Sequence, residues 1–99
     1  MAISLLIARI GDPVFGFCSI DEIPIGGVIQ SGASKTYCEG ARVARVGDVV
    51  LSDCGHTGTI VSGATSVYAE GNKVARVNDS FSGVYSGTIT GSASKTYAS

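Results

Sequence analysis

The sequence has little charge, no tryptophan and no long hydrophobic run. Only 15% of its 99 residues are charged, and seven basic residues against eight acidic ones give a formal net charge of −1. This balance excludes the strongly basic surface that binding to nucleic acid or anionic lipid requires. The longest apolar stretch, residues 1–8, is far too short to span a membrane. It also lacks the basic start and long apolar middle of a secretory signal. We therefore expect one domain, covering residues 1–99, that is made in the cytoplasm.

Helical periodicity and a disulfide pattern are also missing. No window of about ten residues has the 3.6-residue apolar period of a helix. Three cysteines, an odd number in a chain without an export signal, argue against a disulfide framework. The chain does have 44% apolar residues, and fourteen glycines against two prolines, a composition typical of small all-β folds with tight turns. We predict an all-β fold whose limited core would benefit from a bound metal ion.

Two sequence blocks recur three times in the same order, which predicts three structural repeats. The first block reads Ala-Arg, a β-branched residue, Gly or Asn, then Asp, at residues 8–12, 44–48 and 75–79. The second begins with Gly and ends with Tyr, at residues 27–37, 58–68 and 87–97. Each unit is interpreted as strand, loop, strand, turn. Strands are expected at residues 43–46 and 74–77 and around Ile29, Ile60 and Ile89, and hairpins are expected at Glu39-Gly40 and Glu70-Gly71-Asn72.

The residue before each repeated aspartate is Gly11, Gly47 or Asn78. Gly and Asn adopt positive φ most readily, so this position is predicted to be left-handed. The aspartate can then accept hydrogen bonds from nearby backbone N–H groups, and the arginine three residues earlier can pair with it. We interpret the block as a repeated structural turn rather than a catalytic site.

The two ends of the chain complement each other. The last repeat stops at Tyr97, where the second strand of a hairpin would begin, and residues 3–10 supply a strand of that kind. An open solenoid would carry atypical polar caps at its ends. We therefore expect a closed, pseudo-threefold body of three hairpin repeats.

The segment after each aspartate, expected to be a loop, holds the reactive side chains. The sixth residue after the aspartate is Cys18, Cys54 or Tyr85. In a pseudo-threefold body the two cysteines would point toward one axis, and the single histidine, His56, lies two residues after Cys54. Thiolate and imidazole are the ligands that zinc prefers. Cys18, Cys54 and His56 are therefore candidate metal ligands.

The remaining thiol, Cys38, could be a fourth ligand by its chemistry. It lies beside a hairpin turn, however, where it would instead be a small buried hydrophobic residue. All three thiols could also be ordinary core residues.

A catalytic role is disfavoured. A nucleophile and base at Cys54 and His56 would need a third group to orient the histidine, and the nearby groups are Asp48 or Asp53. The adjacent carboxylates at residues 21–22 are interpreted as a solvated part of a loop. We expect no enzyme activity.

This order of motifs resembles the PAAR-repeat proteins. The corresponding tetrapeptides are Arg-Val-Ala-Arg at residues 42–45 and Lys-Val-Ala-Arg at residues 73–76, which keep the Ala-Arg of Pro-Ala-Ala-Arg and replace its first two residues. The resemblance covers residues 3–97. It implies a small cone-shaped β body that caps a trimeric central spike, one copy per trimer, and helps it to puncture the target cell envelope. The spike would be VgrG of type VI secretion or the spike of a contractile phage tail.

The resemblance also implies a zinc ion near the point, held by His and Cys side chains after Gly-Asp, which selects Cys18, Cys54 and His56. Iron is a second candidate, and Tyr85 stands where the family often has another ligand. About two residues lie beyond the repeats at either end, so we expect a stand-alone cap whose effector cargo, if any, binds non-covalently. The cap would be made in the bacterial cytoplasm, assembled on a phage tail or secretion spike, and delivered into the target cell. The alternative is a metal-binding module without a spike partner, which would not need an exposed apolar base.

Overall fold

The computed structural model describes residues 5–64, 67–92 and 97–98, and this part of the chain contains strands and no helix. Six strands form a closed barrel in the order β10-β11-β2-β3-β6-β7. Their bounds are β2 Pro13–Cys18, β3 Ile23–Ile29, β6 Val49–Ser52, β7 Thr57–Ile60, β10 Ser80–Gly83 and β11 Tyr85–Ile89. The all-β prediction is confirmed.

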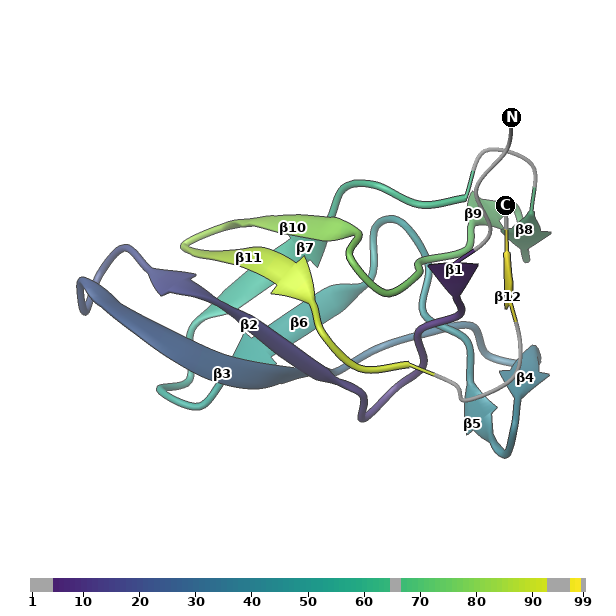
Figure 1. Cartoon of the computed structure of the whole chain (residues 1–99), viewed down its shortest axis with the longest axis horizontal. Helices are drawn as coiled ribbons and strands as arrows, with labels where there is room; N and C mark the ends of the chain where they lie inside the picture. The colour runs from purple at the N-terminus through teal and green to yellow at the C-terminus, as the bar shows by residue number, and fades with distance from the viewer. Residues whose placement is uncertain (1–4, 65–66, 93–96, 99) are drawn as a thin grey trace.

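Three short two-stranded pairs lie at the opposite end of the molecule from the turns of the barrel (Figure 1). We call this region the hairpin end. Its pairs are β1 Leu5–Leu6 with β12 Tyr97–Ala98, β4 Tyr37–Cys38 with β5 Ala41–Arg42, and β8 Tyr68–Ala69 with β9 Asn72–Lys73.

The predicted hairpins and the predicted joining of the chain ends are present. The turns at Glu39-Gly40 and Glu70-Gly71 have positive φ at both residues, from 50° to 89°. Two consecutive residues with positive φ are typical of two-residue hairpin turns, whose twist matches the right-handed twist of the strands they join. Strand β1 pairs with β12, so the first and last described segments complete one pair. Residues 65–66 and 93–96 of the second sequence block lie outside the described part of the chain.

A ring of backbone hydrogen bonds joins the three repeats. The N–H of Ala44 donates to the carbonyl of Ala8 at 3.0 Å, Ala75 donates to Ala44 at 2.9 Å, and Ala8 donates to Ala75 at 3.0 Å. All three alanines are completely buried. Each of the three copies of the first sequence block is therefore bonded to both of the others, in a closely packed interior.

The expectation of strands at residues 43–46 and 74–77 was wrong. These segments form isolated bridges, of which Arg9 with Val43 and Arg45 with Val74 are two. The reason is that consecutive residues bond to different neighbours: Val43 donates to the carbonyl of Thr36, whereas Ala44 donates to Ala8. A regular strand pair needs one partner strand over several residues.

The repeated turn has the predicted geometry. The φ angles of Gly11, Gly47 and Asn78 are 89°, 97° and 74°. In the first copy, Asp12 accepts hydrogen bonds from the backbone N–H of Arg9 at 2.8 Å and from its guanidinium at 3.0 and 3.1 Å. The same set of bonds recurs in the other two copies. In each copy the hydrogen bond from the guanidinium to the aspartate raises the pKa of the arginine.

The segments that follow the aspartates are strands, which corrects the expectation of loops. Strands β2, β6 and β10 each begin at the residue directly after the aspartate and pair with β3, β7 and β11. Inside the barrel they enclose a core that includes Val14, Ile29, Val50, Ile60, Phe81, Tyr85 and Ile89. Consequently Cys18 is the last residue of a strand that is paired on both sides, opposite Tyr85 in β11 and Ile23 in β3.

Candidate metal centre

Four potential metal donors converge at the turns of the barrel. Cys18 ends strand β2, and Asp21 lies in the turn between β2 and β3. Cys54 and His56 lie in the turn between β6 and β7. Two thiols, one imidazole nitrogen and one carboxylate oxygen all lie within 4.8 Å of one another. The three residues singled out from the sequence are therefore brought together, from two hairpins that are distant in the chain.

The imidazole of His56 is central to this cluster. Its Nδ1 lies 3.1 Å from Sγ of Cys18 and 3.4 Å from Sγ of Cys54. A carboxylate oxygen of Asp21 lies 3.7 Å from the same nitrogen. Cys18 is fully buried, whereas the side chains of His56 and Asp21 are 32% and 40% exposed. Two sulfurs, one nitrogen and one oxygen match the number and type of ligands in tetrahedral zinc sites, so the cluster could hold a metal ion and is compatible with zinc.

Ser52 fixes the turn that carries Cys54 and His56. Its hydroxyl donates to the carbonyl of His56 at 2.9 Å and accepts from the N–H of His56 at 3.0 Å. The chain reverses at Gly55, whose φ is 92° and which tolerates this value because it has no Cβ. This arrangement presents the thiol and the imidazole on the same side of a short turn.

The environment of Cys54 acts on its pKa in both directions. The hydrogen bond with Ser52 lowers the pKa, whereas desolvation and the neighbouring Asp21 and Cys18 raise it, and the net effect is an increase. A metal ion bound by this thiol must displace its proton, so metal binding is coupled to proton release.

Asp21 was missed by the sequence reasoning, which assigned it to a solvated loop. Its turn is held by hydrogen bonds from the N–H of Glu22 to the carbonyl of Cys18 and from the N–H of Ser19 to the carbonyl of Val84. These bonds turn the chain so that Asp21 lies back over the cysteine. The one available signal was its spacing, three residues after Cys18. Neither Asp48 nor Asp53, the groups considered from the sequence, has the contact with His56 that Asp21 has.

Cys38 and Tyr85 lie outside the donor cluster. Cys38 is 6% exposed and packs in a separate apolar cluster with Ile7, Ala33 and Val43 at the hairpin end. This location agrees with the interpretation of Cys38 as a small buried hydrophobic residue.

Tyr85 is fully buried and packs against Phe81, with ring centroids 4.9 Å apart. Its hydroxyl donates to the carbonyl of Ile25 at 2.7 Å. Burial raises the pKa of Tyr85, which keeps the hydroxyl protonated as a donor. The third repeat thus supplies a core residue at the position where the other two supply cysteines.

A model of the PAAR motif matches residues 21–83. The chain belongs to the PAAR-motif family. PAAR proteins are structural spike-tip proteins rather than enzymes, associated with type VI secretion spikes or phage tails, and membership implies a role as a spike-tip cap. The matched segment includes Asp21, Cys54 and His56. A comparison with curated proteins gave no match. Among the described residues of this PAAR protein, no helix has the length and apolar character needed to cross a membrane.

Proposed function

We propose that this PAAR protein is a non-enzymatic cap that binds the end of a trimeric central spike, one copy per trimer, and aids membrane puncture. The spike is VgrG of a type VI secretion system or the central spike of a contractile phage tail. The match to the PAAR motif carries this proposal. The cap is made in the bacterial cytoplasm, joins the spike tip, and enters the target cell with it. Any effector cargo binds non-covalently.

The difference between the two ends of the molecule supports the proposal. The donor cluster lies among the barrel turns, and the short strand pairs lie at the hairpin end (Figure 1). We assign the barrel turns to the point and the hairpin end to the base. At the base Tyr37 is 64% exposed and Tyr68 is 58% exposed. Exposed aromatic side chains are common at the centre of protein interfaces.

The repeated backbone geometry supports binding to a threefold partner. The ring of hydrogen bonds among Ala8, Ala44 and Ala75 relates the three repeats to one another in the same way. A trimeric spike ends in three equivalent surfaces, and a single chain with pseudo-threefold symmetry can contact all three at once. This symmetry predicts one copy per trimer.

A metal ion would stiffen the point. We assign Cys18, Cys54 and His56 as ligands and Asp21, in place of Cys38, as the fourth. Zinc is the metal that this donor set favours, and iron is the second candidate. The bound ion would cross-link hairpin β2–β3 to hairpin β6–β7 and replace core packing that a narrow tip lacks. The strand pairing of Cys18 and the hydrogen bonds of Ser52 in the turn that carries Cys54 and His56 support this assignment.

Native mass spectrometry of the protein mixed with a trimeric spike fragment tests the proposal. We expect a complex of one chain per trimer. The double variant Tyr37→Ser, Tyr68→Ser should bind more weakly, whereas Thr88→Ser on the outside of the barrel should bind like the wild type. A folded, metal-loaded protein that binds no spike fragment would contradict the proposal and would favour a stand-alone metal-binding module.

A further inference from the structure

Among the described residues, lysine and arginine are confined to one part of the molecule. The barrel strands and the turns between them, residues 13–29, 49–60 and 80–89, contain no lysine or arginine. They do contain the carboxylates Asp21, Glu22 and Asp53. In the part of the chain that the structure describes, six basic residues belong to the hairpin end or to the segments that join it to the barrel, at positions 9, 35, 42, 45, 73 and 76.

The two basic residues of the short strands, Arg42 in β5 and Lys73 in β9, have no ion pair in the described part of the chain. Arg9, Arg45 and Arg76 each pair with the aspartate of their own turn. In contrast, no ion pair joins Arg42 or Lys73 to a carboxylate in the part of the chain that the structure describes.

The nearby carboxylate of Glu70 is already occupied. It accepts hydrogen bonds from the backbone N–H groups of Ser34 and Lys35 and from the hydroxyls of Ser34 and Thr36. The two cations are therefore available to an external anion.

Each of the two cations lies directly opposite a tyrosine in its strand pair. Arg42 is the partner of Tyr37 in pair β4–β5, and Lys73 is the partner of Tyr68 in pair β8–β9. All four residues are exposed. In the remaining pair, β1–β12, the partner of Tyr97 is Leu6, so this pair lacks the cation. Two of the three strand pairs thus combine a cation with an aromatic ring.

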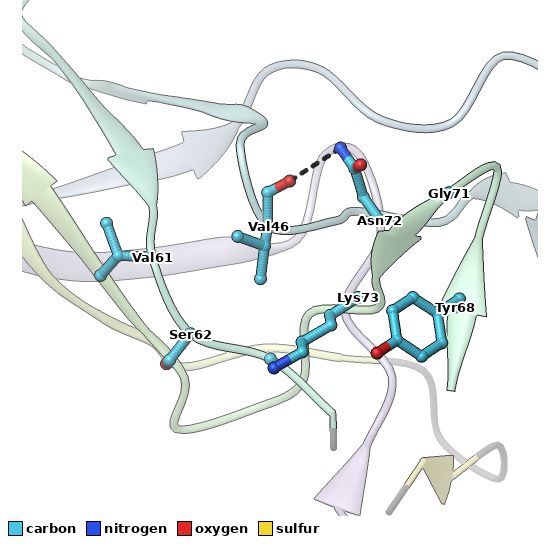
Figure 2. Close-up of a pocket in the computed structure, with 8 residues that line it drawn as sticks. Val46, Val61, Ser62, Tyr68, Gly71, Asn72 and Lys73 are labelled. Carbon is cyan, nitrogen blue, oxygen red and sulfur yellow. Dashed lines mark hydrogen bonds between the residues drawn. The ribbon is translucent and has the colours of Figure 1, made fainter. Parts of the chain in front are cut away.

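Lys73 also lines a recess of about 540 Å³ beside pair β8–β9. Figure 2 shows Lys73 and Tyr68 on one side of this recess and Val61 on the other. Val61 is 53% exposed, and Val46 adds a further apolar wall. The amide of Asn72 is held in place by donating to the carbonyl of Val46 at 3.1 Å. The described residues that line the recess include no acidic one.

We propose that the hairpin end binds an acidic protein surface, and that the recess beside β8–β9 receives a segment with a carboxylate next to an apolar side chain. The carboxylate would pair with Lys73, and the apolar group would contact Val61 and the ring of Tyr68. Charge complementarity selects this occupant, because the recess offers a cation without a competing anion. The proposal rests on the proposed function, which makes the occupant part of the spike. Beyond that function, the proposal states that the end of the spike is acidic.

The test compares charge variants for binding to the trimeric spike fragment. Lys73→Glu and Arg42→Glu should each weaken binding by about tenfold, and the affinity of the wild type should fall as the salt concentration rises to about 0.3 M. Lys73→Met, which keeps the aliphatic stem, should have a smaller effect than Lys73→Glu. Glu22→Gln, a charge change at the barrel turns, is the matched control and should bind like the wild type. Circular dichroism checks that each variant retains its strands.

A peptide that alternates glutamate and leucine provides a second measurement, which does not require the spike. Amide chemical shifts of Val61, Asn72 and Lys73 should move on titration with this peptide, and a lysine–leucine peptide should not move them. Binding of the spike fragment by wild type and Lys73→Glu with equal affinity would overturn this inference and leave the proposed function intact. Specific peptide binding without spike binding would instead contradict the proposed function and retain the recess as an acidic-segment site.

Discussion

Replacing Asn78 by valine is expected to destabilise the protein by about 1–2 kcal/mol. Asn78 has a φ of 74°, in the left-handed region that a β-branched residue resists. Space does not limit the substitution, because Asn78 already carries a side chain and is exposed. The turn is also prevented from relaxing, since the N–H of Asn78 donates to the carbonyl of Ile89 at 2.8 Å. The expected loss of stability therefore comes from the strained backbone conformation of the valine.

Thermal denaturation measures this effect. A change of about 1 kcal/mol shifts the Tm of a domain of this size by about 4–8 °C. The control is Asn78→Gly, which places in the third repeat the residue found in the other two and should be at least as stable as the wild type. If the valine variant lies within about 0.5 kcal/mol of the wild type, the range of ordinary surface substitutions, the left-handed strain argument is refuted.

Three further substitutions probe contacts between repeats and inside the barrel. Hydrogen bonds from the N–H of Lys35 and the hydroxyls of Ser34 and Thr36 lower the pKa of Glu70 from 4.5 to about 2. The ionised carboxylate of Glu70 therefore stabilises the fold fully above pH 4.5, and this stabilisation is lost as the pH falls toward 2. Glu70→Gln should remove this part of the pH dependence of urea unfolding, and an unchanged profile would contradict the assignment. Tyr85→Phe leaves the carbonyl of Ile25 without its donor and should cost about 1 kcal/mol in urea unfolding, whereas a neutral result would mean that water replaces the hydroxyl. Ala44→Val overfills the closed ring and should cost about 1–3 kcal/mol by the same assay; wild-type stability would show that the ring has spare room.

Much of this fold follows from the internal repeats. Gly11, Gly47 and Asn78 occupy equivalent positions, and only a positive φ explains why these two residue types alternate there; the structure has that geometry. The pairing of the chain ends follows from the missing half of the last repeat. The proximity of Cys18 and Cys54 was predictable for the same reason, since equivalent positions of a closed body face a common region.

The remaining features depend on interactions that the repeats do not encode. The sequence does not reveal the first barrel strand, because residues 13–18 are almost entirely apolar. Phe15 and Phe17 are exposed and Val14 is buried, so no polar residues mark the two-residue alternation of a strand. Asp21 joins the donor cluster only because the turn after Cys18 folds back through its backbone hydrogen bonds. Neither the other repeats nor any periodicity contains that information.

Elemental analysis and native mass spectrometry of protein purified without chelator or added metal test the metal centre most directly. We predict one zinc or iron ion per chain. The ion should be lost in the double variant Cys54→Ser, His56→Ala, bound more weakly in Asp21→Asn, and retained in Cys38→Ser, with strand content unchanged in each. A metal-free wild type, or a full complement of metal in the double variant, would contradict the assignment of Cys18, Cys54, His56 and Asp21 as a metal centre.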